Sequence, residues 1–178
     1  SRGLGDVYKR QVQHHEDGQV DMDHLAELLA GSEKTTLVSL MHANNEVGVM
    51  VDLAWLSALC REHGALLHSD TVQTMGHYPL DLNAVDVDFL ACSAHKLHGP
   101  KGTGFLYTNP KLRIDGMIVG GGQERMLRGG TENVAGIVGL AEAFATAFEH
   151  MAEHEAHIRA MKARMVQGLR ERIPGVVF

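Results

Sequence analysis

Three apolar segments of this sequence are each followed by side chains that can do chemistry. These side chains supply an amine, a carboxylate, two amides, a hydroxyl and an imidazole, and they are Asn44, Asp70, Gln73, Ser93, His95 and Lys96. An amine and a carboxylate in one cleft can form a simple ion pair, but pyridoxal phosphate (PLP) also requires both. A lysine amine forms a Schiff base with this cofactor, and a carboxylate keeps its pyridine nitrogen protonated, so that the ring acts as an electron sink. The remaining groups can hydrogen-bond its phosphate and phenolate oxygens.

Helices are expected to alternate with these apolar segments. We predict strands at 36–41, 65–68, 87–92 and 102–107, and helices at 23–30 and 53–63, with Asp23 and Asp52 as their N-caps. This alternation predicts an α/β fold with a mainly parallel sheet. Ligands of such sheets bind beyond the carboxyl ends of the strands, so the candidate side chains are expected to share one crevice.

The last third of the sequence has a different pattern. Residues 116–130 are predicted to form a glycine-rich loop, and residues 134–172 a long helix that Pro174 ends. The apolar stripe of this helix, which includes Met161 and Met165, is expected to pack in the core. Residues 176–178 resemble the first residues of a further strand.

The composition indicates a soluble globular domain. The 178 residues are 44% hydrophobic and 21% charged, which is enough for a sizeable core. The net charge of -6 argues against a nucleic-acid partner, and no apolar run is long enough to cross a membrane. With two cysteines, Cys60 and Cys92, a disulfide framework is not expected, and a cytoplasmic location is favoured.

Four motifs containing the candidate residues resemble those of class V aminotransferase-like enzymes, and more narrowly those of the cysteine desulfurases of the NifS/IscS type. The motifs are HANNEVG at 42–48, HSDTVQ at 68–73, SAHKLHGPKG at 93–102 and GGGQERMLRGGTEN at 120–133. Each is weak alone, but their combination in this order is specific. The resemblance implies the PLP-dependent transferase fold type I, a three-layer α/β sandwich. Residues 12–172 would be part of its large domain, 173–178 the start of a small domain, and 1–11 a foreign segment.

The resemblance also implies a role for each residue. Lys96 would be the catalytic residue, holding PLP as the Schiff base and then moving the Cα proton of the substrate. Asp70 would pair with the pyridine nitrogen, and Gln73 would bond the phenolate oxygen with Asn44 nearby. Ser93 and His95 would bind the phosphate. Thr131 would reach the phosphate of a neighbouring subunit, which implies a homodimer.

The reaction implied by the resemblance converts L-cysteine to L-alanine and leaves sulfur as a persulfide on an enzyme cysteine. An iron–sulfur scaffold or another sulfur acceptor would be the partner. Cys60 is predicted on a helix face against the sheet and Cys92 in a buried strand, so neither is expected to be the nucleophile. We therefore expect the fragment itself to be inactive.

Plainer interpretations compete with these roles. Asp70 and Thr131 would also suit helix N-caps, Asn44 would suit a turn, and Lys96 would suit the surface. The shared helix face of His150, His154 and His157 is more typical of a solvated surface than of a metal site. At the level of function, the alternatives are another class V enzyme, such as a selenocysteine lyase or a transaminase, and a non-catalytic module that kept the fold.

Overall fold

The structure is a computed structural model that describes residues 8–178. Most of the segment 1–11, which we predicted to be foreign, lies outside the described residues. The chain divides into two compact units. Unit 1 comprises the chain up to Gln73 together with Asp81–Ala91 and Leu106–Arg113, and unit 2 comprises Thr74–Leu80, Cys92–Phe105 and Ile114–Phe178.

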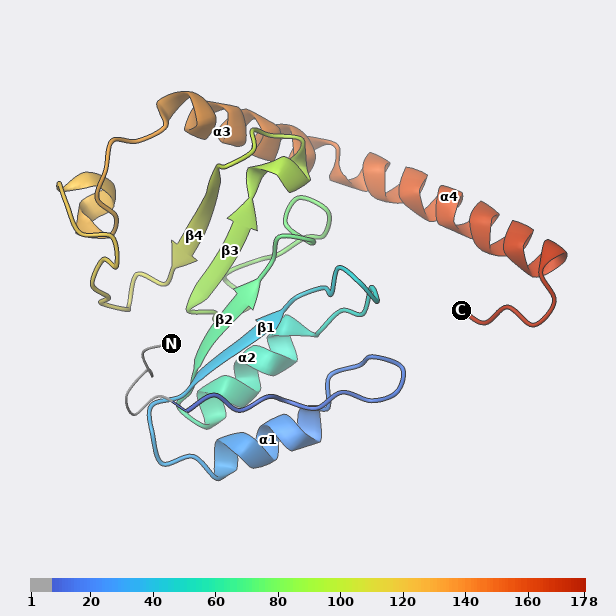
Figure 1. The fold of residues 1–178 in the computed structure, drawn as a ribbon, viewed down its shortest axis with the longest axis horizontal. Helices are drawn as coiled ribbons and strands as arrows, with labels where there is room; N and C mark the ends of the chain where they lie inside the picture. Colours follow the sequence, from blue (N-terminus) through green and yellow to red (C-terminus); the bar gives the residue numbers. More distant parts are fainter. Residues whose placement is uncertain (1–7) are drawn as a thin grey trace. The chain divides into compact units, whose positions relative to one another are not determined.

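Within residues 8–178, four strands form one sheet whose spatial order, β1-β2-β3-β4, is also their order in the sequence (Figure 1). They are β1 (Leu37–Met41), β2 (Leu66–Asp70), β3 (Phe89–Ser93) and β4 (Gly104–Thr108). β2 is parallel to both β1 and β3, and its last residue, Asp70, is in register with Met41 and Ala91. β4 runs opposite to β3 in Figure 1. The predicted α/β fold with a mainly parallel sheet is confirmed.

Two helices of unit 1, α1 (Met22–Ala30) and α2 (Leu53–Glu62), begin at aspartate caps. The Asp52 carboxylate accepts hydrogen bonds from the N–H groups of Ala54 and Trp55, as predicted for an N-cap. The cap of α1 is Asp21, which accepts from His24 N–H, so the prediction of Asp23 was wrong. Asp23 lies in the first turn instead, where a negative charge also suits the helix dipole.

The core of unit 1 lies on one face of the sheet. Burial alternates along β2, with Leu67 and Ser69 inside, because successive side chains of a strand point to opposite faces. The apolar residues buried in this core include Leu25, Val38, Leu56, Cys60, Leu67 and Leu90. Full burial of each large aliphatic side chain contributes about 1.5–3 kcal/mol. This core fixes the strands that end at Met41 and Asp70.

A polar network holds the start of β3 in unit 1. The Asp88 carboxylate is 2% exposed and accepts from Leu67 N–H and from the Arg61 guanidinium, both at 2.7 Å. Arg61 also pairs with the Asp86 carboxylate at 3.1 Å. The Asn109 side-chain amide donates to Asp86 Oδ1 at 3.1 Å. These bonds join the segment before β3 to α2 and to β2.

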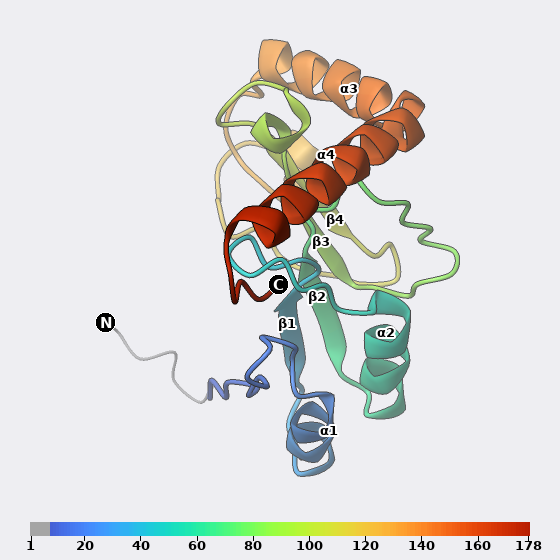
Figure 2. The ribbon, with the colours of Figure 1, turned by 90° about the vertical axis from the view of Figure 1, so that its right-hand side faces the viewer.

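Unit 2 contains two helices where the sequence predicted one. They are α3 (Val134–Glu149) and α4 (Met151–Arg172), and the chain changes direction between them (Figure 2). His150 separates them, with φ −102° and ψ 10°. The N-cap of α3 is Asn133, whose side chain accepts from Gly136 N–H at 3.1 Å. Thr131 is therefore not the helix cap that the plainer interpretation suggested.

The apolar stripe of α4 lies exposed. Met161 and Met165 are 47% and 58% exposed, and α4, which is described in full, has no buried residue. The prediction that this stripe packs in the core was wrong for this structure. Residues 176–178 form no strand in the described chain, which also differs from the prediction. Over residues 8–178, no helix has both the length and the apolar character that a membrane crossing needs.

Candidate functional site

Asn44 lies in a tight turn after β1 in unit 1. Its Oδ1 accepts from Glu46 N–H at 2.8 Å and from Val47 N–H at 3.0 Å, and Gly48 N–H donates to its backbone oxygen at 3.0 Å. Gly48 has φ +75°, which favours glycine. The interpretation of Asn44 as a turn residue is therefore confirmed. Because its side-chain oxygen faces the turn, a ligand would meet the donor end of the amide.

Asp70 is the last residue of β2 and is fixed by its own backbone. Its Oδ1 accepts from Val72 N–H at 2.9 Å, and its carbonyl oxygen accepts from His42 N–H at 2.9 Å. Residues 72–77 are turns rather than a helix, so the interpretation of Asp70 as a helix N-cap was wrong. Gln73, half-buried, lies within these turns. Asp70 thus keeps a carboxylate at the carboxyl end of a central parallel strand.

His42 is buried beside this end of unit 1. Burial lowers the pKa of its imidazole below the ordinary value of 6.5, and the negative charge of Asp52 opposes that effect. Its backbone oxygen accepts from Val51 N–H at 2.9 Å. The imidazole is therefore held mainly in its neutral form at neutral pH.

Lys96 lies in unit 2, on a short 3₁₀-helix that we label η1 (Ala94–Leu97). The helix begins directly after β3 and ends at His98, whose φ of 64° is left-handed. The N–H groups of His98 and Gly99 both donate to Ala94 O. Lys96 is exposed, and within residues 8–178 its amine makes no ion pair. An amine of this kind is free to react with a carbonyl compound.

The two predicted phosphate ligands lie on the same turn. Ser93 is the N-cap residue of η1, and in the described chain its hydroxyl makes no capping bond. His95 is exposed one residue before Lys96. A hydroxyl and an imidazole that the local backbone does not use are suitable donors for an anion.

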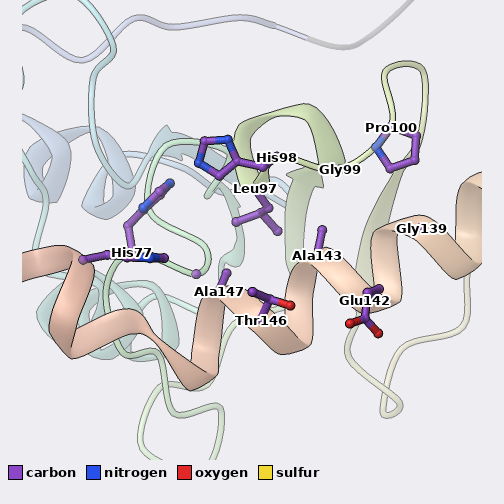
Figure 3. A pocket seen from close by; sticks show the side chains of 12 residues that line it. His77, Leu97, His98, Gly99, Pro100, Gly139, Glu142, Ala143, Thr146 and Ala147 are labelled. Carbon is purple, nitrogen blue, oxygen red and sulfur yellow. The ribbon is translucent and has the colours of Figure 1, made fainter.

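Close packing against α3 fixes this turn in unit 2. Leu97 is 3% exposed, and Figure 3 shows it among Ala143, Ala147 and its neighbours on α3. A Cβ added to Gly76 would lie 2.6 Å from Leu97 Cδ2, and one added to Gly99 would lie 3.1 Å from Ala143 Cβ. Glycine is required where surfaces approach this closely.

The glycine-rich segment of unit 2 has an unusual backbone. A second 3₁₀ segment, η2 (Gln123–Met126), contains Glu124 and Arg125 with φ of 48° and 55°. Such left-handed angles are uncommon outside glycine. Thr131 is exposed just beyond this segment. The sequence predicted the loop but gave no signal for its left-handed residues.

Neither cysteine is placed as a nucleophile. Cys60 is 0% exposed and Cys92 is buried in β3. Burial raises the pKa of the Cys60 thiol to about 11, so at neutral pH the thiol stays protonated. Since the thiolate is the reactive form, this residue is inert.

The three helical histidines show no metal-binding arrangement. The rings of His150 and His154 are 5.9 Å apart between centroids, and His150 Nδ1 lies 3.4 Å from a Glu153 oxygen. Across residues 8–178, no three His, Cys, Asp or Glu side chains gather as metal ligands.

The predicted site residues thus form two local groups and one separate residue. In unit 1, the structure places Asn44, Asp70 and Gln73 at or just after the carboxyl ends of the parallel neighbours β1 and β2. In unit 2, it brings Ser93, His95 and Lys96 onto one turn, and Thr131 lies on another segment. That Asp70 and Lys96 flank one cofactor ring stays a prediction.

Comparisons with known proteins give a consistent result. The sequence profile of one family, aminotransferase class-V, matches residues 7–178. The chain is 43% identical over 157 residues to cysteine desulfurase IscS of Histophilus somni, covering 87% of this chain and 38% of that protein. It is 40% identical over 161 residues to IscS of Clostridium botulinum, covering 90% and 40%.

A solved structure agrees with these relatives. The NifS-like protein of Rickettsia africae superposes with a TM-score of 0.88 at 36% identity, covering 91% of this chain and 45% of that one. The chain therefore spans less than half the length of each of these proteins.

Proposed function

Because this chain belongs to the aminotransferase class-V family, we propose that it forms part of the PLP-binding domain of a cysteine desulfurase of the NifS/IscS type. The observation that carries the proposal is the turn after β3, which exposes the Lys96 amine while burying the next residue, Leu97. The names of the similar proteins favour a desulfurase over a selenocysteine lyase or a transaminase. The polar groups around both local clusters are those that this cofactor uses.

The residues present fit PLP by the chemistry of their donors and acceptors. When bound, PLP withdraws electrons from the substrate Cα. Lys96 would hold its aldehyde carbon, Asp70 would hold the pyridine nitrogen, and Gln73 and Asn44 would face the phenolate oxygen. The hydroxyl of Ser93 and the imidazole of His95 would hold the phosphate. The Asx turn at Asp70 supports this role, because it orients the carboxylate without neutralising it.

The proposed substrate is L-cysteine. The Lys96 amine would take the proton from the substrate Cα at Nζ. The C–S bond of the substrate would break, and its sulfur would join the thiol of an enzyme cysteine, so that L-cysteine and a thiol give L-alanine and a persulfide. The buried Cys60 and Cys92 are unsuited to accept this sulfur, so we expect the 178-residue chain to release no alanine.

Further parts of the proposal concern the whole protein. We propose a cytoplasmic homodimer in which Thr131 reaches the phosphate of the second subunit. The exposure of Thr131 and of the apolar Met117 and Val119, which are 97% and 89% exposed, supports a contact by this segment. An iron–sulfur scaffold or another sulfur acceptor would take the persulfide sulfur. Residues 12–172 would belong to the large domain and 173–178 to the start of a small one.

Titration of the purified protein with PLP tests the function. We expect an absorbance band of lysine-linked cofactor, and, after borohydride reduction, a phosphopyridoxyl adduct on the peptide that contains Lys96. Lys96→Ala should abolish both, whereas Lys162→Ala, which removes an exposed lysine of α4, should change neither. An adduct on other lysines, or none, would favour the non-catalytic module.

A further inference from the structure

The turn that follows Gln73 reaches the backbone of the Lys96 turn. In unit 2, the N–H groups of His77 and Tyr78 both donate to Thr74 O at 2.9 Å, and Gly76 has φ +76°. This tight turn directs the His77 side chain to η1, where its Nε2 lies 3.2 Å from the carbonyl oxygen of Lys96.

The chemistry of this contact fixes which atom donates. A carbonyl oxygen only accepts hydrogen bonds, so Nε2 of His77 must carry the hydrogen. Both the neutral Nε2–H tautomer and the imidazolium satisfy this condition. The bond therefore persists whether or not His77 is protonated, and it leaves the Lys96 amine unengaged.

The residue before His77 holds the residue after Lys96. Gly76 lies so close to Leu97 that an added Cβ would be 2.6 Å from Leu97 Cδ2 and 3.0 Å from Ala147 Cβ. The dipeptide 76–77 thus holds η1 twice, through the Lys96 carbonyl and through the Leu97 side chain. Two adjacent restraints fix the backbone of Lys96 more firmly than either would alone.

Resting on the proposed function, we propose that His77 is a positioning residue that fixes the backbone of Lys96 and thereby aims its amine at the cofactor. The family motif HSDTVQ at 68–73 ends four residues earlier in the printed sequence, at Gln73, so His77 lies outside the residues assigned above. Its contribution acts through Lys96 and requires no contact with substrate or cofactor.

A cavity beside this contact allows the ring to be changed without overpacking. It has a volume of about 570 Å³ and is lined by residues that include His77, Leu97, His98, Glu142 and His154 (Figure 3). His154 lines the same cavity from α4, where its ring lies against His150. It is therefore a matched control for loss of an imidazole.

Amide hydrogen exchange of the protein without PLP tests the restraint directly. The amides of His98 and Gly99, which donate to Ala94 O, report opening of η1. We expect His77→Phe, which keeps a ring but removes the donor, to raise their exchange about two- to tenfold, the range expected for one lost hydrogen bond. His77→Gln, whose side-chain amide can donate to the same oxygen, should restore protection, and His154→Ala should leave it unchanged.

The same variants then separate the two proposals. If wild type forms the lysine-linked band, we expect His77→Phe to weaken PLP binding about two- to tenfold and His77→Gln to recover it. Unchanged exchange in His77→Phe, or an equal rise in His154→Ala, would overturn the positioning role. A rise confined to His77→Phe, in a wild-type protein that forms no such band, would keep His77 as the anchor of this turn and reject only the cofactor function. Should His77→Phe fail to fold by circular dichroism, His77→Ala would decide by the same criteria.

Discussion

The two ends of β3 are held by different kinds of interaction. Before the strand, in unit 1, Asp88 is buried among charged and polar partners, chiefly Arg61 and the N–H of Leu67. After the strand, in unit 2, Leu97 is buried against glycine and alanine. One end depends on directional bonds and the other on close contact between small residues.

This difference matches what each end has to present. Charged partners beside Lys96 would pair with its amine or shift its protonation, whereas aliphatic packing fixes the turn without competing for that amine. At the start of β3 no free side chain is needed, so a carboxylate can be spent on the backbone. The comparison predicts that packing mutations act most strongly at one end of the strand and charge mutations at the other.

The largest effect is expected from Leu97→Ala, which breaks the packed end. Removing a buried leucine side chain costs about 3 kcal/mol of unfolding free energy, because a cavity remains. Urea unfolding followed by circular dichroism measures it. Leu106→Ala, at a leucine that is 55% exposed, should cost about 0.5 kcal/mol. Equal losses at the two positions would contradict the packing argument.

A smaller loss, about 2 kcal/mol, is expected from Asp88→Ala at the polar end. The mutation leaves the buried Leu67 N–H without its acceptor, while Arg61, whose side chain is 35% exposed, remains partly solvated. The half-exposed Asp86 supplies the control, because Asp86→Ala should cost about 1 kcal/mol or less. The same urea experiment decides, and a greater loss for Asp86→Ala would show that the buried carboxylate is not the main anchor.

The smallest effect is a pH dependence in unit 1 at the end of β1. Burial lowers the pKa of His42 below 6.5, so the unfolded chain binds the proton more readily. The contribution of His42 to stability is complete above pH 6.5 and decreases as the pH falls below that value toward the folded pKa. Unfolding in urea at about pH 7.5 and 5.5 should show this decrease. His42→Gln should reduce it, while His63→Gln, at an exposed histidine, should not.

Local signals in the sequence predicted much of the fold. Asp52 was identifiable as a cap because an aspartate precedes an apolar helical pattern, and β2 ends at the predicted Asp70. The grouping of Ser93, His95 and Lys96 also followed from the sequence, because the three residues adjoin one another after a strand. These are contacts over short sequence distances, which patterns of residue type report well.

Features that depend on tertiary contacts were not predictable in this way. The break at His150 has no proline or glycine to announce it, and helical spacing of apolar residues continues across it. Asp21 and Asp23 are equally good caps by residue type, so their order could not be decided. The bond from His77 to Lys96 joins segments 19 residues apart and has no signature in either segment. The exposure of Met161 shows that an apolar stripe indicates a surface suited to burial, not the burial itself.

The sheet is ordered in space as it is ordered in the sequence. Each strand therefore meets a partner that the ribosome has already released, and no strand must wait for a later one before it can pair. Because domains fold from the amino terminus during synthesis, the sheet can grow one strand at a time as the nascent chain emerges. The segment carrying Lys96 would then be added to a β1–β2 pair that has already formed.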